Sequence, residues 1–110
     1  MSRKYTVRYS PAAKDDLRGI SSYILYTLQS PQAAKHLTTK IRSEIRALSS
    51  MAERYPLVDW EPWASMNMRK VPVGNFIVFY QFNTETFTVT VTRIFYGGRD
   101  IPRIVREGWE

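Results

Sequence analysis

The chain opens with apolar and polar residues at alternate positions. Tyr5, Val7 and Tyr9 are separated from one another by polar side chains. Successive side chains of a strand point to opposite faces of the sheet, so a period of two is typical of a half-buried strand. The pattern therefore predicts a first strand over residues 3–9.

Two stretches with the apolar period of a helix come next. Each starts with a Ser-Pro pair, Ser10-Pro11 and Ser30-Pro31, which supplies an N-cap hydroxyl and a proline suited to the first helical position. Apolar residues then recur three or four positions apart, at Ala13, Leu17, Ile20, Ile24 and Leu28 and again at Ala34, Leu37, Ile41, Ile45 and Leu48. Each set forms one stripe along a helix. Because the connection around Gln29 is short, we expect the two helices to be antiparallel.

The second half of the chain returns to the pattern of strands. Residues 51–64 contain prolines and tryptophans and show neither period, so we interpret them as an irregular connection. Strand patterns follow at residues 68–71, 76–82 and 87–96, with turn residues at 74–75 and 83–85. Gly97-Gly98 ends the last strand. A short C-terminal segment of one or two helical turns is indicated by Ile101, Ile104, Val105 and Trp109.

The order of these elements predicts an α+β fold with a single domain over residues 1–110. An antiparallel two-helix hairpin would cover one face of a mainly antiparallel four-stranded sheet, and the other face would stay open. Alternation along the last strand places Arg93 in one row with Val89, Val91 and Phe95. A buried charge is costly unless it is paired. We therefore expect Arg93 either to meet a carboxylate or to lie beyond the helices.

Composition and charge narrow the classes of partner and chemistry. The chain has 16 Lys and Arg against 10 Asp and Glu, and its net charge of +6 favours an acidic partner such as nucleic acid or an acidic protein segment. The absence of cysteine excludes disulfides, thiolate zinc sites and a cysteine nucleophile. No apolar run reaches the roughly 20 residues that span a bilayer, and no apolar signal segment is present. We expect a cytoplasmic protein without a membrane partner.

Four local strings occur in an order that resembles the RelE/ParE superfamily of bacterial toxins over nearly the whole chain. They are YSPAA at residues 9–13 with Asp16-Leu17, SPQAA at 30–34, MRKVPVGNF at 68–76 with Phe79-Tyr80, and RIFYGGRDI at 93–101. The resemblance implies the toxin of a type II toxin–antitoxin pair, which a cognate antitoxin wraps with an extended or helical segment. Members similar to RelE cut messenger RNA in the ribosomal A site, and members similar to ParE poison DNA gyrase.

Cleavage of RNA needs cations that stabilise the negative charge on the scissile phosphate. It also needs a general base and a general acid that accept and donate protons. Arg69 and Arg93 match arginine positions that recur in the superfamily, and we predict that they stabilise the phosphate charge with help from Arg99. We expect these guanidinium groups to converge on the face that the hairpin leaves bare. Tyr96 and Lys70 are candidates for a general acid or base, or for contact with the substrate. Tyr96 stands at a position where many relatives carry histidine. The ordinary pKa of a tyrosine, near 10, would have to be lowered by neighbouring arginines, and Tyr96 could equally be an aromatic that closes the end of the sheet.

Several other polar residues were considered for a role in binding, catalysis or metal coordination. Arg103 and Arg106 extend the cationic set along the tail as candidate phosphate contacts, or are simply solvated. His36 lies on the second helix, far along the chain from the arginines, and is not expected to be catalytic. Asp15 and Asp16 are interpreted as charges that complement the start of a helix. No paired histidine and carboxylate pattern supports a metal, and we expect no cofactor.

The resemblance leaves the target open. Residues 69–76 and 97–101 look more like those of ParE members than of the RelE nucleases. The leading hypothesis is ribosome-dependent cleavage of messenger RNA by a metal-independent endoribonuclease. The alternative is an inhibitor of DNA gyrase that uses the basic face and the helical hairpin for contact and has no bond-breaking residues. A third hypothesis is a non-toxic nucleic-acid-binding module that holds phosphates without cutting.

Two further groups of residues have two interpretations each. Trp60 and Trp63 could stack on bases, but tryptophans beside prolines more often close the edge of a core, which is the interpretation that we favour. The outer face of the hairpin carries cations that could meet acidic residues of an antitoxin: Lys14, Arg18, Lys35, Lys40, Arg42 and Arg46.

Overall fold

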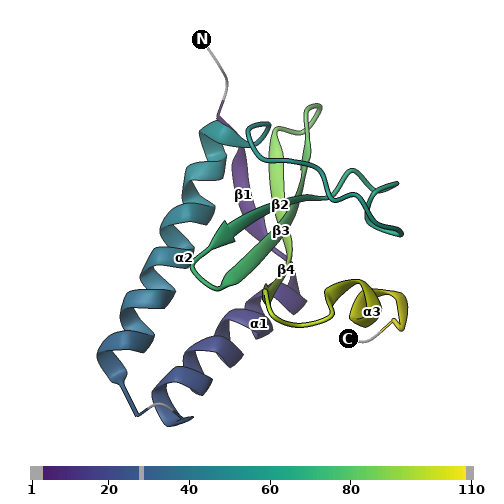
Figure 1. The fold of residues 1–110 in the computed structure, drawn as a ribbon. Coiled ribbons are helices and arrows are strands. Elements are labelled where there is room, and N and C mark those ends of the chain that lie inside the picture. The colour runs from purple at the N-terminus through teal and green to yellow at the C-terminus, as the bar shows by residue number, and fades with distance from the viewer. Residues whose placement is uncertain (1–3, 28, 109–110) are drawn as a thin grey trace.

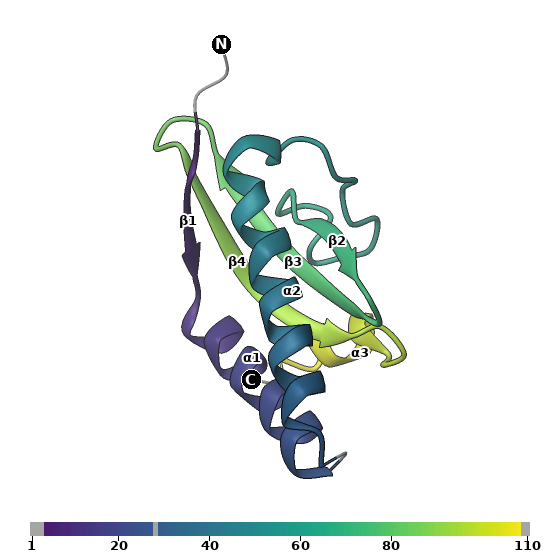
Figure 2. The same cartoon turned by 90° about the vertical axis from the view of Figure 1, so that its left-hand side faces the viewer.

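The computed structural model describes residues 4–27 and 29–108, which form the expected α+β fold (Figure 1). The elements are strand β1 (Thr6–Tyr9), helix α1 (Pro11–Ser22), a π-helical turn η1 (Tyr23–Thr27), helix α2 (Pro31–Met51), strands β2 (Arg69–Val73), β3 (Phe76–Asn83) and β4 (Thr88–Tyr96), and helix α3 (Ile101–Arg106). The helical hairpin covers one face of the sheet (Figure 2). The apolar positions assigned to Leu28 and Trp109 lie outside the described residues. None of the helices in the described ranges is long and apolar enough to cross a membrane.

Both helices of the hairpin begin where the Ser-Pro pairs predict. Oγ of Ser10 accepts a hydrogen bond from the amide of Ala13 at 3.0 Å, and Oγ of Ser30 accepts one from the amide of Ala33 at 3.2 Å. The Ser10 hydroxyl also donates to the carbonyl of Thr92 on β4 at 2.8 Å. This cap therefore fixes the start of α1 to the sheet. The first helix is less regular than predicted, because its last turn is the π-helical η1.

The sheet has the strand order β1-β4-β3-β2. Strands β2, β3 and β4 form an antiparallel meander, and β1 lies parallel to β4 at one edge. Parallel strands need a long connection, which the helical hairpin and the meander together supply. The prediction of a mainly antiparallel four-stranded sheet is confirmed.

The face of the sheet beneath the hairpin holds the larger apolar core. Ile41, Ile45 and Leu48 of α2 are fully buried there against sheet residues such as Val78 and Tyr80. Burial of an aliphatic side chain of this size stabilises the fold by about 1.5–3 kcal/mol. Packing of both helical stripes against one face, as the sequence predicts, therefore contributes much of the stability.

The opposite face of the sheet is also covered, and our expectation that it would stay open is wrong. A second buried cluster lies on it, made of Val58, Trp63, Met68, Phe79, Phe95 and Ile101. The ring of Trp63 stacks on Trp60 at a centroid distance of 5.2 Å and lies 4.8 Å from the ring of Phe79. The core interpretation of the two tryptophans is confirmed. The sequence did not predict this second cluster, because the residues that cover this face come from an irregular segment and a six-residue helix. Neither is long enough or regular enough to show a periodic pattern of apolar residues.

A β-bulge shifts the side-chain alternation within β4. The pairs that β4 makes with β3 skip Thr92, which is an extra residue between Val91 and Arg93. Val91 packs under the hairpin, whereas Phe95 packs in the second cluster on the opposite face. The predicted single row of Val91, Arg93 and Phe95 is therefore wrong, because strict alternation does not continue through the bulge.

The buried hydroxyl of Tyr80 joins β3 to the end of the hairpin. It donates to the carbonyl of Ala52 at 2.8 Å. Burial raises the pKa of Tyr80 from 10.0 to about 12, against the opposing charge of Arg69. With the pKa higher in the folded state, the unfolded chain releases this proton first. The stability that depends on this group is therefore present below pH 10 and is lost as the pH rises towards 12.

We expect Tyr80→Phe to lower the free energy of unfolding at pH 7 by roughly 1–3 kcal/mol, because the carbonyl of Ala52 loses its donor. The variant should also lose less stability than the wild type between pH 9 and pH 11. Urea unfolding followed by circular dichroism at several pH values measures both effects. Tyr26→Phe, at a side chain that is 74% exposed, is the matched control and should behave as the wild type. An unchanged alkaline response in Tyr80→Phe would contradict the assignment.

Candidate functional site

Arg93 on β4 is held by Asp16 of α1. Its Nε and Nη2 donate to the two carboxylate oxygens of Asp16 at 2.8 and 3.0 Å. The amide of Ile94 donates to the same carboxylate at 2.9 Å. The side chains of Arg93 and Asp16 are only 12% and 14% exposed. The prediction that Arg93 meets a carboxylate is confirmed, and Asp16 does more than complement the start of a helix.

The length of β1 explains why α1 can reach Arg93. Strand β1 pairs with β4 only as far as Tyr9, which lies opposite Val91. Beyond this point no strand in the described part of the chain pairs with that side of β4, and α1 runs beside it (Figure 1). The chain turns into α1 at Ser10, so Asp16 follows within two helical turns. A short first strand thus places a carboxylate against the second half of β4.

Arg69, at the start of β2, bonds to the main chain. Its Nη1 donates to the carbonyl of Tyr55 at 2.6 Å and to that of Glu53 at 3.2 Å. Its guanidinium carbon lies 5.1 Å from the ring centroid of Phe82, a distance at which a cation and an aromatic ring attract each other. Arg69 therefore holds the irregular segment after α2 to the sheet.

The two arginines do not converge on one bare face. Arg69 rests against Phe82, which packs against the core beneath the hairpin. Arg93 lies 4.5 Å from the ring centroid of Phe95, which belongs to the second cluster on the opposite face. The expected convergence fails because Arg69 faces the hairpin side of the sheet, whereas Arg93 lies at the opposite face, which the second cluster covers.

Tyr96 and Arg99 border a groove of about 680 Å³ between α1 and the end of β4. Its lining is mostly apolar and includes Ile20, Tyr23, Phe76, Ile94 and Phe95. The ring of Tyr96 is 50% exposed and packs edge to face on Phe76 at 5.8 Å. The guanidinium carbon of Arg99 lies 5.7 Å from the ring centroid of Phe95, the same ring that Arg93 contacts. We call this hollow the Tyr96 groove.

Gly98 allows Tyr96 to lie over the main chain at the edge of this groove. A β-carbon at Gly98 would be 2.5 Å from Cε2 of Tyr96, closer than such atoms approach in real structures. Any larger residue at this position would have to displace the ring. The Gly97-Gly98 pair that ends the strand in the sequence therefore also sets the position of Tyr96.

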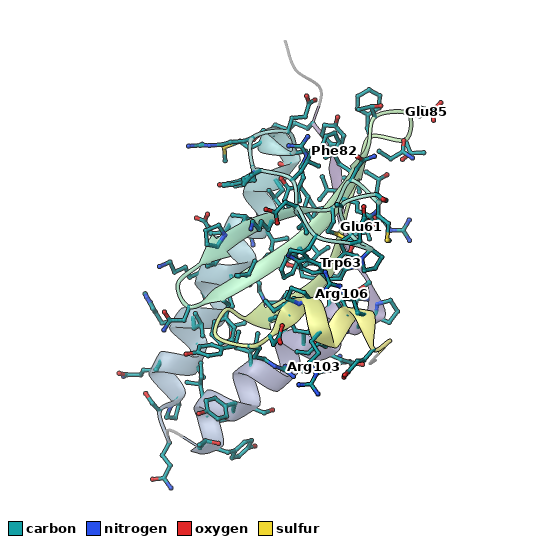
Figure 3. All side chains as sticks on the ribbon, turned by 45° about the vertical axis from the view of Figure 1, so that its right-hand side comes forward. Glu61, Trp63, Phe82, Glu85, Arg103 and Arg106 are labelled. Carbon is teal, nitrogen blue, oxygen red and sulfur yellow. The ribbon has the colours of Figure 1, made fainter. Side chains whose placement is uncertain are left out.

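The other cations predicted to contact the substrate lie outside the Tyr96 groove. Lys70 is half-buried on β2. Arg103, on α3, pairs with Glu107 at 3.1 Å on the surface. Arg106 donates to the carbonyl of Glu61 at 3.0 Å, which joins α3 to the irregular segment (Figure 3). None of these three side chains is among the residues that line the Tyr96 groove with Arg99.

Two features of the site were missed in the sequence. Asp16 was not identified as the partner of Arg93, although it lies three residues after Ala13 and four before Ile20, on the apolar stripe of α1. A carboxylate on a buried stripe indicates a buried cation elsewhere in the chain, and this signal could have been used. Tyr23 was missed as a groove residue because nothing in the sequence marks the π-helical turn that carries it.

The site offers no evident place for a metal ion. His36 is exposed on α2, away from the Tyr96 groove. Within residues 4–27 and 29–108, no three histidine, aspartate or glutamate side chains form a group that could hold a metal. The described site therefore consists of arginines, tyrosines and apolar side chains, together with Asp15 and Asp16 of α1, which also line the Tyr96 groove.

Comparison with known proteins gives a family and a fold. The model of the family described as "ParE toxin of type II toxin-antitoxin system, parDE" matches residues 7–101. A structure of the chromosomal ParDE system from P. aeruginosa has a TM-score of 0.69 at 17% identity, covering 86% of this chain and 98% of that one. The RelBE2 toxin–antitoxin complex from Mycobacterium tuberculosis has a TM-score of 0.60 at 19% identity, with 84% and 98% covered.

A third similar structure is an archaeal RelE–RelB complex from Pyrococcus horikoshii OT3, with a TM-score of 0.52 at 14% identity over 87% of this chain and 98% of that one. No curated protein matches the chain in sequence. At these identities the solved structures support the fold alone. The family model is what supports membership of a family.

Proposed function

The chain belongs to the family of ParE toxins of type II toxin–antitoxin systems, and on that premise we propose that it inhibits DNA gyrase by contact, without bond-breaking chemistry of its own. The observation that carries the proposal is the buried pair of Arg93 with Asp16. A nuclease of the RelE kind would direct the Arg93 guanidinium at a phosphate. Here Nε and Nη2 are directed at a carboxylate of the same chain.

Binding of a phosphate by Arg93 would be unfavourable in free energy, because it would break the buried pair with Asp16. The phosphate would have to displace Asp16 from Nε and Nη2, and Asp16 also holds the amide of Ile94. Removing one partner of a buried ion pair typically costs about 3–5 kcal/mol. Arg69 is similarly engaged with two main-chain carbonyls. Both observations favour a structural role for the two arginines and a contact mechanism for the toxin.

The Tyr96 groove is the surface that best fits such a contact. Tyr96 is half-exposed beside apolar side chains, and Arg99 is exposed at the rim. Tyrosine and arginine beside an apolar hollow are the residues that most often dominate the binding energy of protein interfaces. We assign Tyr96 and Arg99 to contact with gyrase.

A cognate antitoxin is the second expected partner. Two of the three similar structures are described as a toxin–antitoxin system or complex, and the third is described as a RelE–RelB complex. This chain has the same fold and belongs to the ParE family. The antitoxin would neutralise it by binding its surface.

Ribosome-dependent cleavage of messenger RNA is the second candidate function. The observation in its favour is that Arg93 and Arg99 contact one ring, Phe95, beside Tyr96. In that mechanism Arg93, Arg99 and Tyr96 would face the scissile phosphate and its protons. The other predicted residues, Arg69, Lys70 and Arg103, would bind RNA further away.

The experiment that separates the two functions uses one protein preparation and two targets. Purified protein is added to gyrase with relaxed plasmid and ATP, and to translating ribosomes with a defined messenger. We expect loss of supercoiling, or accumulation of linear plasmid after protein removal, and an intact messenger by primer extension. A cut messenger together with unaffected gyrase would overturn the proposal in favour of the nuclease.

The double variant Tyr96→Ala/Arg99→Ala should inhibit gyrase at least about tenfold more weakly, because it removes two anchors of the contact, each of which can contribute more than 1 kcal/mol. The measurement is the protein concentration that halves supercoiling. Lys40→Ala, at an exposed cation on α2 outside the Tyr96 groove, is the control and should inhibit as the wild type does. Equal inhibition by the double variant and the wild type would show that the contact lies elsewhere.

A further inference from the structure

Gly19 lies in the interior of α1, where nothing in the described chain requires a glycine. Apart from proline, glycine is the least favourable residue inside a helix. Gly74 and Gly108 have a positive φ, and a β-carbon at Gly98 would meet the ring of Tyr96. Neither reason applies to Gly19. Apart from its chain neighbours and its own helical backbone, no described atom lies within 4 Å of the position that its β-carbon would take. A partner that packs on α1 would supply the missing reason.

Gly19 belongs to the wall of the Tyr96 groove that α1 contributes. Asp15 lies one helical turn before it and Tyr23 one turn after it, and both residues also line the groove. The wall therefore has a gap between these two side chains. Another backbone can come closer to a helix at a glycine than at any other residue, because glycine has no β-carbon. The groove is thus shaped for a main chain that passes close to α1 at Gly19.

Two exposed tyrosines line the groove together with this gap. Tyr23 on α1 is 57% exposed, and Tyr96 at the end of β4 is half-exposed. The amide of Tyr23 bonds to the carbonyls of both Gly19 and Ile20, at the point where α1 passes into the π-helical turn η1. Single π-helical turns are frequent at functional sites. Large exposed aromatic side chains beside an apolar hollow are typical of a binding surface.

The main-chain groups of β4 on the side of α1 favour a helix over a strand as the occupant. The carbonyl of Thr92 accepts a hydrogen bond from the hydroxyl of Ser10 at 2.8 Å, and the amide of Ile94 donates to Asp16 at 2.9 Å. An added strand would need these groups as partners for its own main chain. A helix needs none of them, because its main-chain hydrogen bonds lie within the helix.

The charges of the groove favour a protein over a nucleic acid. Asp15 and Asp16 contribute carboxylates to the lining, and Arg99 is the one cation among its described lining residues. Asp16 is neutralised by its buried pair with Arg93, whereas Asp15 has only an exposed pair with Arg18. A phosphate would be repelled by Asp15. A helix with an apolar face, a basic residue opposite Asp15 and an acidic residue opposite Arg99 would complement the groove.

We propose that the Tyr96 groove receives an amphipathic helix of gyrase, which lies along α1 with its backbone closest at Gly19. The identity of this partner rests on the proposed function, because Gly19 lines the same groove as Tyr96 and Arg99, which we assign to contact with gyrase. The helical form of the occupant rests on the gap at Gly19 and on the bonded main chain of β4. A small residue of the partner helix packs on Gly19, and its larger apolar side chains pack on Tyr23 and Tyr96.

Gly19→Leu tests the close approach. Leucine favours a helix more than glycine does, and the free chain has room at this position, so the urea midpoint should be no lower than that of the wild type. The added side chain fills the gap, so the dissociation constant for purified gyrase holoenzyme should rise at least about tenfold in biolayer interferometry. Gly19→Ala should raise the urea midpoint and weaken binding about two- to fivefold. Thr39→Leu, at an exposed position of α2 outside the groove, is the control and should bind as the wild type does.

The helical form of the occupant is tested by photo-crosslinking. A photoreactive phenylalanine analogue replaces Tyr23 in one protein and Tyr96 in another, and the crosslinked residues of gyrase are identified by mass spectrometry. We expect both probes to react with one segment of gyrase, at positions about three, four or seven apart, which share one face of a helix. Crosslinks two positions apart would indicate a strand, and crosslinks scattered over separate segments would contradict a helix in the groove.

Equal affinity of Gly19→Leu and the wild type for gyrase would overturn the inference and leave the proposed function intact. If Gly19→Leu instead abolished self-association of the wild type in sedimentation velocity, the occupant would be a second copy of this chain. A lower urea midpoint in Gly19→Ala would also overturn the inference, because the glycine would then have a role inside the fold. Wild-type protein that neither binds nor inhibits gyrase would contradict the proposed function, and with it the partner named here.

Discussion

Replacement of Asp16 by alanine is expected to lower the free energy of unfolding by about 3–5 kcal/mol, the usual cost of breaking a buried ion pair from one side. The variant leaves Arg93 buried without the carboxylate that binds its Nε and Nη2. It also removes the acceptor of the Ile94 amide, beyond the point where the pairing of β4 with β1 ends. Urea unfolding followed by circular dichroism gives the change directly.

The neighbouring residue provides the control for this prediction. Asp15→Ala removes the exposed pair with Arg18 from the same helical turn and should cost less than about 1 kcal/mol, because surface pairs are screened by solvent. Similar losses in the two variants would show that the Asp16–Arg93 pair is not buried as described. A stable Asp16→Ala protein that gained nuclease activity would contradict the structural role of Arg93.

Trp63→Ala is the second variant for which we expect a large effect. Trp63 is 6% exposed and packs between Trp60 and Phe79 in the second cluster. Removal of a buried tryptophan side chain typically costs about 3–5 kcal/mol. The apolar floor under α3 would be lost with it, since Ile101 belongs to the same cluster. We therefore expect lower stability in urea and faster tryptic cleavage at Arg103 and Arg106 on α3.

Met66→Ala is the matched control within the same segment. Its side chain is 45% exposed, so its removal should change the free energy of unfolding by no more than about 0.5 kcal/mol and leave α3 protected. If Trp63→Ala proved as stable as this control, the second cluster would have to be a loose cover. The sheet would then have an open face, as the sequence alone suggested.

The parts of the fold that could be predicted from the sequence are those marked by a pattern among neighbouring residues, such as a helix cap, an apolar stripe or a strand alternation. The Ser-Pro pairs gave both helix starts because the cap, the proline and the first stripe residue lie within four positions of each other. The stripe of α2 from Ala34 to Leu48 gave its buried face. The meander followed from alternation and from turn residues between its strands.

The parts that could not be predicted depend on single residues and on long-range contacts. One extra residue, Thr92, reverses the faces of β4, and no local pattern distinguishes a bulge from continued alternation. The cover of the second face comes from Trp63 and a helix of six residues, too short to show a period. Asp16 reaches Arg93 across 77 positions of the chain. The candidate site follows from these three features, so its residues could be named from the sequence but not correctly arranged.

The parallel pairing of β1 with β4 has a consequence for the order in which the protein is made. The hydroxyl of Ser10 donates a hydrogen bond to the carbonyl of Thr92, 82 positions later. All residues of β1 pair with residues 88–91 of β4. During synthesis, the first strand can pair with β4 only after residues 88–91 have emerged from the ribosome. Completion of the sheet thus waits for these residues, and a nascent chain that lacks them cannot present the finished sheet to a partner.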